Sequence, residues 1–211
     1  MSTLQAEHVS VSYGGRPVLR DVSVTVRPGQ TLGVRGPSGC GKTTLVRVLA
    51  GLQRPDAGTV SYAGESTPEP GAVALLAQHP RQVCNPRWTL QRILTEPARI
   101  RGEDTAGSVE AARRVGLGAE LLDRYPAQVS DGQLQRACIG RALLQRPRYL
   151  LCDEPTAMLD PIAAEDISRL LAELAEQAAV VLVSHTQTLI TALADRVLDL
   201  TAPDPVAVQP S

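Results

Sequence analysis

Residues 36–43 combine three glycines with a lysine and a threonine in the pattern G-x-x-x-x-G-K-[ST]. The run reads Gly36, Pro37, Ser38, Gly39, Cys40, Gly41, Lys42 and Thr43. Its glycines let the backbone curl, so that successive N–H groups point inward at phosphate oxygens. Lys42 can reach the β- and γ-phosphates of a nucleoside triphosphate, and the Thr43 hydroxyl can ligate Mg²⁺. The run therefore predicts a phosphate-binding loop.

The segments on either side of this loop agree with that interpretation. Residues 31–34 have the pattern of a short strand that enters the loop, and residues 44–50 that of a helix that leaves it. The helix N-terminus adds the positive end of a dipole beside the phosphates, so we also place Thr44 among the nucleotide contacts. The alternative is a glycine-rich turn that binds nothing. The presence of strand, loop, lysine, threonine and helix together disfavours it.

A second group of candidate residues follows the apolar stretch Tyr149–Asp153, where Asp153 and Glu154 are adjacent. A buried strand that ends in two carboxylates is costly unless they face a cation or water. In proteins with such a phosphate loop, this strand lies beside the loop. Asp153 would then hold Mg²⁺ through a water, and Glu154 would orient and polarise an attacking water. The alternative, an ordinary strand end with solvated charges, is weakened by the phosphate loop.

The segment Ser130–Gln133 precedes a helical pattern that begins at residue 131. Ser130 and Gln133 fit a capping box, in which each side chain bonds to the other's backbone N–H. A capped helix N-terminus with a nearby glycine, here Gly132, is also a site for an anion. The two interpretations are compatible, and the residues alone leave both open.

Composition excludes several classes of function. The 211 residues carry 21 Lys and Arg against 22 Asp and Glu, so no basic excess indicates nucleic acid or anionic lipid. No apolar stretch is long enough to span a bilayer, and the polar segment 1–8 lacks a signal-peptide core. The pattern favours a cytosolic protein. The cysteines Cys40, Cys84, Cys138 and Cys152 have no C-x-x-C spacing, so they suggest neither a zinc site nor a redox pair.

Hydrophobic periodicity predicts an α/β fold with a nucleotide-binding core. Antiparallel strands are expected at 6–13 and 18–26, and further strands at 59–62, 73–76, 149–153 and 180–184. Helices are expected at 89–101, 108–115 and 131–144, and after residue 160, where Asp160 is the N-cap and Pro161 the first helical residue. We expect one domain over 1–200, a helical insertion at about 87–146, and a loose tail at 201–211.

Taken together, the phosphate loop, the strand that ends at Asp153 and Glu154, and the Ser130–Gln133 segment resemble the ABC-type ATPases. The resemblance covers about residues 4–200 and implies a P-loop NTPase core, a mixed sheet flanked by helices, with an antiparallel β subdomain and a helical insertion. It implies that Tyr13 stacks on adenine and that Gln78 senses Mg²⁺ and faces a membrane partner. Residues 157–160 match the D-loop, and His185 matches the switch histidine at the γ-phosphate.

One loop and one helix narrow the resemblance to a branch of that family. The loop runs from Gln78-His79-Pro80 to Cys84-Asn85-Pro86-Arg87-Trp88-Thr89-Leu90. It is similar to the Q-x-P…N-P-R-x-T-[VL] run of importer ATPases for dipeptides, oligopeptides and nickel, and the helix at 134–142 is similar to the same branch. The resemblance therefore implies an ATPase that energises uptake of peptides or nickel.

The family resemblance also implies cofactors and partners. It implies ATP with Mg²⁺, and a head-to-tail dimer with an identical or different ATPase chain, in which ATP on one phosphate loop is covered by Ser130, Gly132 and Gln133 of the other. Lys42, Gln78, Glu154 and His185 would be the catalytic groups. Integral membrane permease subunits would form the pore, with an extracytoplasmic solute-binding protein acting through them. The chain would then lie at the cytoplasmic face of the cell membrane.

Two other functions remain open at this stage. One is a soluble ABC ATPase of a cytosolic complex, such as the phosphonate-degradation machinery, which co-purification with membrane subunits would distinguish. The other is a non-enzymatic nucleotide-binding regulator, against which the intact Lys42, Asp153, Glu154 and His185 argue.

The signature segment departs from the family pattern at one position. Relatives carry Leu-Ser-Gly-Gly-Gln, whereas this chain has Val129-Ser130-Asp131-Gly132-Gln133. The negative charge of Asp131 suits the helix N-terminus but would repel a nearby γ-phosphate. Our hypothesis is that the Asp131 side chain points away, so that the contacts of Ser130 and Gly132 survive.

Overall fold

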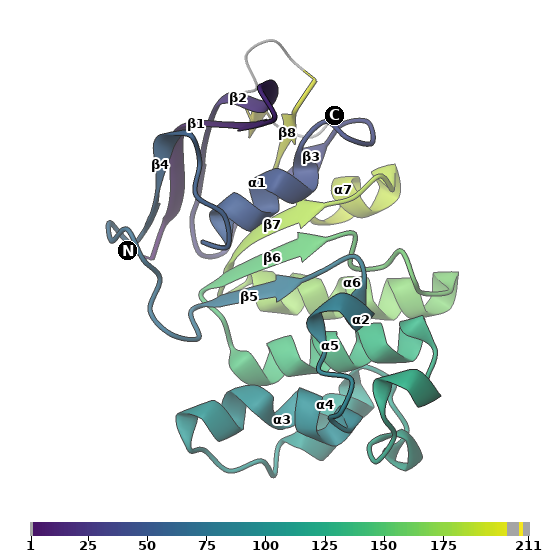
Figure 1. Cartoon of the computed structure of the whole chain (residues 1–211). Helices are drawn as coiled ribbons and strands as arrows, with labels where there is room; N and C mark the ends of the chain where they lie inside the picture. Colours follow the sequence, from purple (N-terminus) through teal and green to yellow (C-terminus); the bar gives the residue numbers. More distant parts are fainter. Residues whose placement is uncertain (1, 202–206, 209–211) are drawn as a thin grey trace. The chain divides into compact units, whose positions relative to one another are not determined.

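The computed structural model describes residues 2–201 and 207–208. The contacts divide the chain into two compact units, each of which is made from separate stretches of sequence. The first contains Met1–Leu75, Arg148–Glu154 and Ala175–Ser211, and the second contains Leu76–Pro147 and Pro155–Leu174. Figure 1 labels the α-helices and the strands β1 to β8.

The first unit begins with an antiparallel sheet of three strands. These are β1 (Leu4–Tyr13), β2 (Arg16–Val26) and β4 (Ala57–Tyr62), in the order β2-β1-β4. In β1 the side chains of Leu4, Ala6, Val9 and Val11 are buried, with polar residues between them. This alternation is typical of a sheet with one buried face.

The main sheet has the order β5-β6-β7-β3-β8-β9. Its strands are β5 (Val73–Leu76), β6 (Tyr149–Asp153), β7 (Ala179–Val183), β3 (Thr31–Arg35), β8 (Arg196–Asp199) and β9 (Ala207–Val208). From β6 to β8 neighbouring strands are parallel, and β9 pairs antiparallel with β8. Every residue of β6 and β7 is buried, as expected for central parallel strands covered on both faces.

Parallel pairing decides where the functional residues go. The phosphate loop follows β3, Glu154 follows β6, and His185 comes two residues after β7. Because the carboxyl ends of parallel strands meet at one edge of the sheet, these three segments share that edge. The strands therefore gather residues separated by more than a hundred positions in the sequence.

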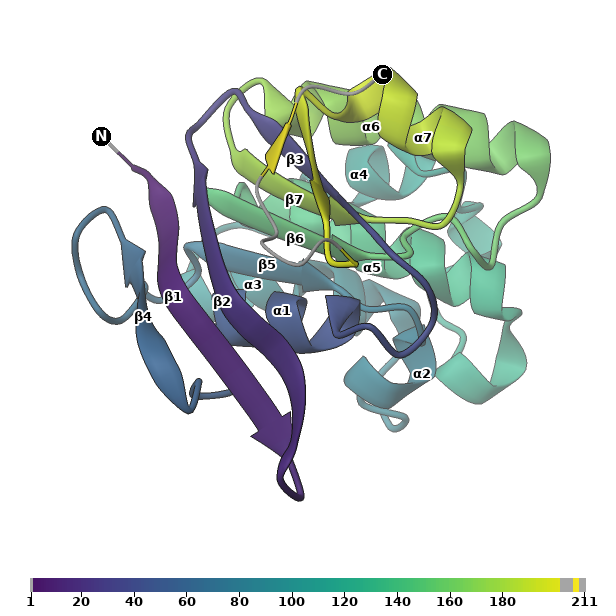
Figure 2. The ribbon, with the colours of Figure 1, turned by 90° about the horizontal axis from the view of Figure 1, so that it is seen from above.

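Helix α1 (Lys42–Leu49) and helix α7 (Gln187–Leu193) complete the first unit. Seen from above in Figure 2, α1 lies between the antiparallel sheet and the main sheet. It buries Leu45, Val46, Val48 and Leu49. Those apolar side chains anchor the helix and so hold its first residue, Lys42, at the end of the loop.

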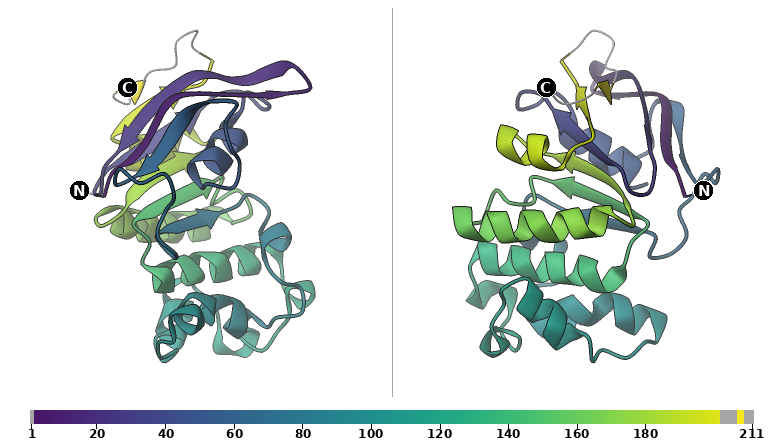
Figure 3. Two further views of the ribbon diagram at one scale, coloured as in Figure 1. Left: turned by 60° about the vertical axis from the view of Figure 1, so that its left-hand side comes forward. Right: turned by 180° about the vertical axis from the view of Figure 1, so that it is seen from behind.

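The second unit is helical. It contains α2 (Pro80–Val83), α3 (Leu90–Arg101), α4 (Ser108–Arg114), α5 (Asp131–Gln145), α6 (Pro161–Ala175), and the 3₁₀ turns Ala119–Leu121 and Pro126–Gln128. Figure 3 shows α3 and α4 beside α5. The buried side chains of α5 include Leu134, Ala137, Cys138 and Ile139, which form the centre of this unit.

Most expected elements are confirmed, with ends that shift by at most two residues. The strand Tyr149–Asp153 is confirmed at both ends, and Asp160 caps α6 by accepting a hydrogen bond from the Ala163 N–H at 3.0 Å. This bond, with other backbone donors, lowers the pKa of Asp160. The sequence analysis missed α2, α7 and β8, which are short and have little periodicity.

The expected loose tail falls largely beyond what the structure covers. Residues 202–206 and 209–211 lie outside the described residues, and Ala207–Val208 form β9. Among the residues that are described, no helix has the length and apolar character needed to cross a membrane.

Candidate nucleotide-binding and hydrolysis site

The phosphate loop has a backbone that requires glycine. Gly36, Gly39 and Gly41 have φ of 148°, 82° and 105°, in the region that residues with a side chain rarely adopt. A Cβ at Gly41 would lie 2.8 Å from both the Leu19 side chain and the Val18 carbonyl. The loop is therefore curled and pressed against β2, and no larger residue fits at position 41.

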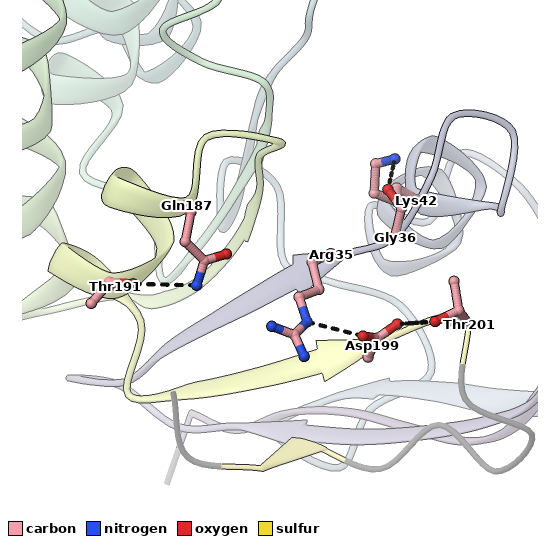
Figure 4. A network of polar contacts seen from close by, with 7 residues as sticks. All are labelled: Arg35, Gly36, Lys42, Gln187, Thr191, Asp199 and Thr201. Carbon is pink, nitrogen blue, oxygen red and sulfur yellow. Dashed lines mark hydrogen bonds and ion pairs between the residues drawn. The ribbon is translucent and has the colours of Figure 1, made fainter. Parts of the chain in front are cut away.

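Lys42 and the start of α1 provide positive charge at this loop. The Lys42 amine donates to the carbonyls of Gly36 at 2.7 Å and Pro37 at 2.9 Å, so it folds back over the loop (Figure 4). The N-cap of α1 is Gly41, which has no side chain to bond to the first-turn N–H groups. Such N–H groups, with the helix dipole, attract an anion.

Below the loop, a second polar group ties the ends of β3 and β8 together. Arg35 Nε donates to Asp199 at 2.9 Å, and the Thr201 hydroxyl donates to the same carboxylate (Figure 4). The Thr201 hydroxyl and N–H, and then Arg35, lower the pKa of Asp199. These bonds fix the strand end from which the phosphate loop departs.

Asp153, the last residue of β6, contacts the end of the phosphate loop, and Glu154 follows it directly. The Thr43 hydroxyl donates to Asp153 Oδ2 at 2.7 Å, which joins two residues that are 110 positions apart. Asp153 and Glu154 are 5% and 8% exposed. Among the described residues, no Lys or Arg side chain pairs with either carboxylate, and Asp153 instead bonds to the Thr43 hydroxyl. A buried carboxylate without a Lys or Arg partner favours a cation, and hydroxyl and carboxylate oxygens are ligands that Mg²⁺ prefers. These residues fit Mg²⁺.

Glu154 is held in an unusual backbone conformation. Its φ is 54°, a left-handed value that costs a residue with a side chain roughly 1–2 kcal/mol. Its N–H donates to the Val183 carbonyl at 3.0 Å. On the side chain, Oε2 lies 2.9 Å from His185 Nδ1 and accepts a hydrogen bond from the Ser184 hydroxyl at 3.5 Å. The turn of the backbone thus aims the carboxylate at the segment after β7.

This geometry connects His185 with Glu154, which the sequence analysis did not foresee as a pair. The His185 side chain is 72% exposed, whereas that of Glu154 is 9% exposed. The histidine therefore covers a buried acid from the solvent side. Ser184, at 2% exposed, was not predicted to take part, because a serine at a strand end carries no distinctive signal.

Other predicted residues lie apart from this cluster in the first unit or belong to the second. Tyr13 is at the end of β1, is 50% exposed and donates to Gln53 Oε1 at 2.8 Å. Its exposed ring is free to stack on a flat ligand. Gln78 lies in the loop between β5 and α2 of the second unit and is partly buried.

The signature segment forms the predicted capping box in the second unit. The Ser130 hydroxyl accepts from the Gln133 N–H at 3.1 Å, and Gln133 Oε1 accepts from the Ser130 N–H at 2.9 Å. Ser130 is exposed. A Cβ at Gly132 would lie 2.8 Å from the Met158 carbonyl, so the backbone of the expected D-loop packs directly against this glycine.

A contact that the sequence did not indicate involves Asp131. Its carboxylate pairs with Arg81 of α2, rather than extending from the helix N-terminus unpaired. Two buried thiols of the same unit also meet: the sulfurs of Cys84 and Cys138 lie 3.4 Å apart. Neither pairing follows from spacing, because 50 and 54 residues separate the partners.

Comparison with known proteins identifies the family. The profile of the ABC transporter family matches residues 19–157. This chain belongs to the ABC transporter family. Its fold, an α/β core with a largely parallel sheet and an antiparallel β subdomain, is that of the ABC ATPases. A solved structure titled as the ATP binding subunit of an ABC transporter superposes with a TM-score of 0.84 at 26% identity, over 94% of this chain and 85% of that one.

Relatives with assigned substrates differ in what they import. An Fe(3+) ions import ATP-binding protein of Rhodococcus jostii is 36% identical to this chain. The alignment covers 94% of this chain and 60% of that relative. A nickel import ATP-binding protein of Shigella boydii is 36% identical over 86% and 74%. A methionine import ATP-binding protein of Caulobacter vibrioides is 37% identical over 96% and 64%. The chain thus spans about 60% of the first relative, and the similarities do not separate the branches.

Proposed function

We propose that this chain hydrolyses ATP as the nucleotide-binding subunit of an ABC importer. The observation that carries the proposal is the buried Glu154 carboxylate, held by His185 and Ser184 at the strand edge where Thr43 bonds to Asp153. These groups lie beside a loop built to surround phosphates. The proposal extends the relatives' importer role to a chain that matches most, though not all, of their length.

In this mechanism the phosphate loop binds ATP through its N–H groups, and Lys42 turns from the loop carbonyls to the β- and γ-phosphates. Thr43 and Asp153 would hold Mg²⁺, which would supply positive charge to the phosphate oxygens. Tyr13 stacks on adenine.

Glu154 then accepts a hydrogen bond from the attacking water and so orients it in line with the γ-phosphate. His185, next to that carboxylate, donates a hydrogen bond to the γ-phosphate and stabilises the charge that develops on its oxygens. The exposed Ser130, with Gly132 and Gln133, contacts ATP on a second ATPase chain. This pairing explains why a polar helix N-terminus is left at the surface.

For the substrate, we propose nickel or peptides, imported through separate membrane permease subunits at the cytoplasmic face of the membrane. The run from Gln78 to Leu90 supports this branch, and so does the nickel-import relative, of which the chain covers 74%. An extracytoplasmic binding protein would deliver the solute. The uptake of radioactive nickel or of labelled dipeptides by cells with and without this chain tests the substrate.

The test of the chemistry is Glu154→Gln, which keeps the shape of the side chain and removes its charge. We expect release of phosphate from ATP to fall roughly 100-fold or more, while ATP binding is retained and the ATP-bound dimer accumulates. The matched control is Glu173→Gln, on the surface of α6 and paired with Arg114, which leaves turnover unchanged. Unchanged phosphate release in Glu154→Gln would contradict the proposed role of Glu154.

A further inference from the structure

The side chain of Arg81 makes three contacts with the segment that leads into α5. Its Nη1 donates to the Pro126 carbonyl at 2.6 Å, its Nη2 donates to the Val129 carbonyl at 2.8 Å, and its Nε donates to the Asp131 carboxylate. Arg81 lies on α2, three residues after Gln78, and belongs with its partners to the second unit. One guanidinium thus binds the chain on both sides of Ser130.

This arrangement uses properties that only arginine has. The guanidinium is planar and presents five N–H donors in a fixed fork, so it can bond to two carbonyls and a carboxylate at once. A lysine ammonium at this position could match the charge but not the geometry. The contacts therefore define both the path of residues 126–131 and the direction of the Asp131 side chain.

An unpaired carboxylate at position 131 would oppose nucleotide binding at this helix. Asp131 is the first residue of α5, between Ser130 and Gly132, the residues that the proposed function places on the phosphates of ATP. A negative charge at a helix N-terminus stabilises the helix but repels a phosphate there. Members of the family with glycine at this position do not meet this repulsion.

We propose that Arg81 is a positioning residue that compensates for Asp131, keeping its charge paired so that the start of α5 can accept the γ-phosphate of ATP on a second chain. The inference rests on the proposed function and adds to it a residue outside the family's signature. The effect is one-sided: an Asp131 carboxylate without Arg81 weakens dimerisation, whereas loss of the charge of Asp131 removes the need for Arg81.

The test is a double-mutant cycle in full-length protein that carries Glu154→Gln, with ATP-dependent dimerisation measured by light scattering. We expect Arg81→Gln to raise the ATP concentration for half-maximal dimerisation about tenfold, the effect of an unpaired like charge. Because the phosphate loop is untouched, binding of a fluorescent ATP analogue to the single chain stays unchanged. Adding Asp131→Asn to Arg81→Gln restores dimerisation, because no charge is left to repel the phosphate.

A matched control is Arg113→Gln, which removes a guanidinium paired with Glu110 on the exposed surface of α4. It leaves dimerisation unchanged. Asp131→Asn alone provides a second test that does not depend on the folding of the Arg81 variants. We expect dimerisation within about twofold of the parent, because the pair is already neutral.

Three results would overturn the inference. They are normal dimerisation of a folded Arg81→Gln protein, a double variant as impaired as Arg81→Gln, and dimerisation that tightens many-fold in Asp131→Asn alone. In each of these cases the parent still dimerises with ATP. If the parent protein itself did not dimerise, the proposed function would fail, and the inference with it.

Discussion

The phosphate-loop edge of the first unit and the start of α5 in the second unit differ in the burial of their polar groups and in the partners that those groups bond to. At the first, the two carboxylates are buried and are bonded to exposed side chains: Asp153 to Thr43, and Glu154 to His185. At the second, Ser130 and Asp131 are exposed, and their bonds go to the local backbone or to Arg81. The first region collects the groups for chemistry within one chain, whereas the second presents a shaped surface.

This difference indicates a different dependence on ligand in the two regions. Adjacent buried carboxylates without a Lys or Arg partner make the first region costly until a cation arrives, so it is prepared for a ligand. The second region has satisfied its polar groups already, through a capping box and an ion pair, and costs little when empty. Its contribution to function therefore depends on contact with another molecule.

The largest expected effect tests the first region alone. Lys42→Ala removes the charge that reaches the β- and γ-phosphates, so ATP affinity of the single chain falls about 100-fold or more. Isothermal titration calorimetry measures the loss, and Arg47→Ala, further along α1 on its exposed side, is the control that retains affinity. Full affinity in Lys42→Ala would show that the loop holds ATP by its backbone alone.

A smaller effect is expected for Gly132→Ala, which tests the second region without changing the first. Gly132→Ala places a Cβ 2.8 Å from the Met158 carbonyl, so the start of α5 or the backbone at 158 must shift. We expect ATP turnover to fall about tenfold, since displacement of the positioned groups lowers the rate, while the single chain binds ATP with unchanged affinity. Weaker binding by the single chain would mean that the two regions do not act separately.

The smallest expected effect, that of Ser130→Ala, distinguishes a role of Ser130 in helix capping from a role in nucleotide contact. Ser130→Ala and Thr89→Ala each remove a hydroxyl that caps a helix of the second unit, bonded to the N–H of Gln133 at 3.1 Å and of Arg92 at 3.3 Å. Each should cost about 1 kcal/mol of the free energy of unfolding, measured by denaturant titration. Only Ser130→Ala should also lower turnover. Equal turnover in both variants would leave Ser130 a cap alone.

How far the sequence leads can be judged from particular residues. The phosphate loop was recognisable because its glycines and lysine are adjacent in sequence and each is required by the same ligand. The bond between Thr43 and Asp153 could be anticipated from the strand that ends in acids. The pairing of Glu154 with His185 could not, because the left-handed turn at Glu154 depends on the neighbouring strand β7.

The position of Asp131 illustrates the same limit. Its charge next to the signature serine is visible in the sequence. The hypothesis that its side chain points away from the γ-phosphate could not be tested from the sequence, because no local pattern indicates a partner for it. Arg81 gave no signal, because α2 is only four residues long and a surface arginine is common. The branch of the family also stays open, since iron, nickel and methionine importers match about equally well.

By itself, the sequence determined the strands and helices that carry the site, the phosphate loop and the capping box, because each depends on residues close together along the chain. Only the tertiary structure decided which distant groups meet: Asp153 with Thr43, Glu154 with His185, and Asp131 with Arg81. The physical reason is that parallel strand order and helix packing fix these encounters. Both arise from burial of apolar surface over the whole chain, which no local pattern encodes.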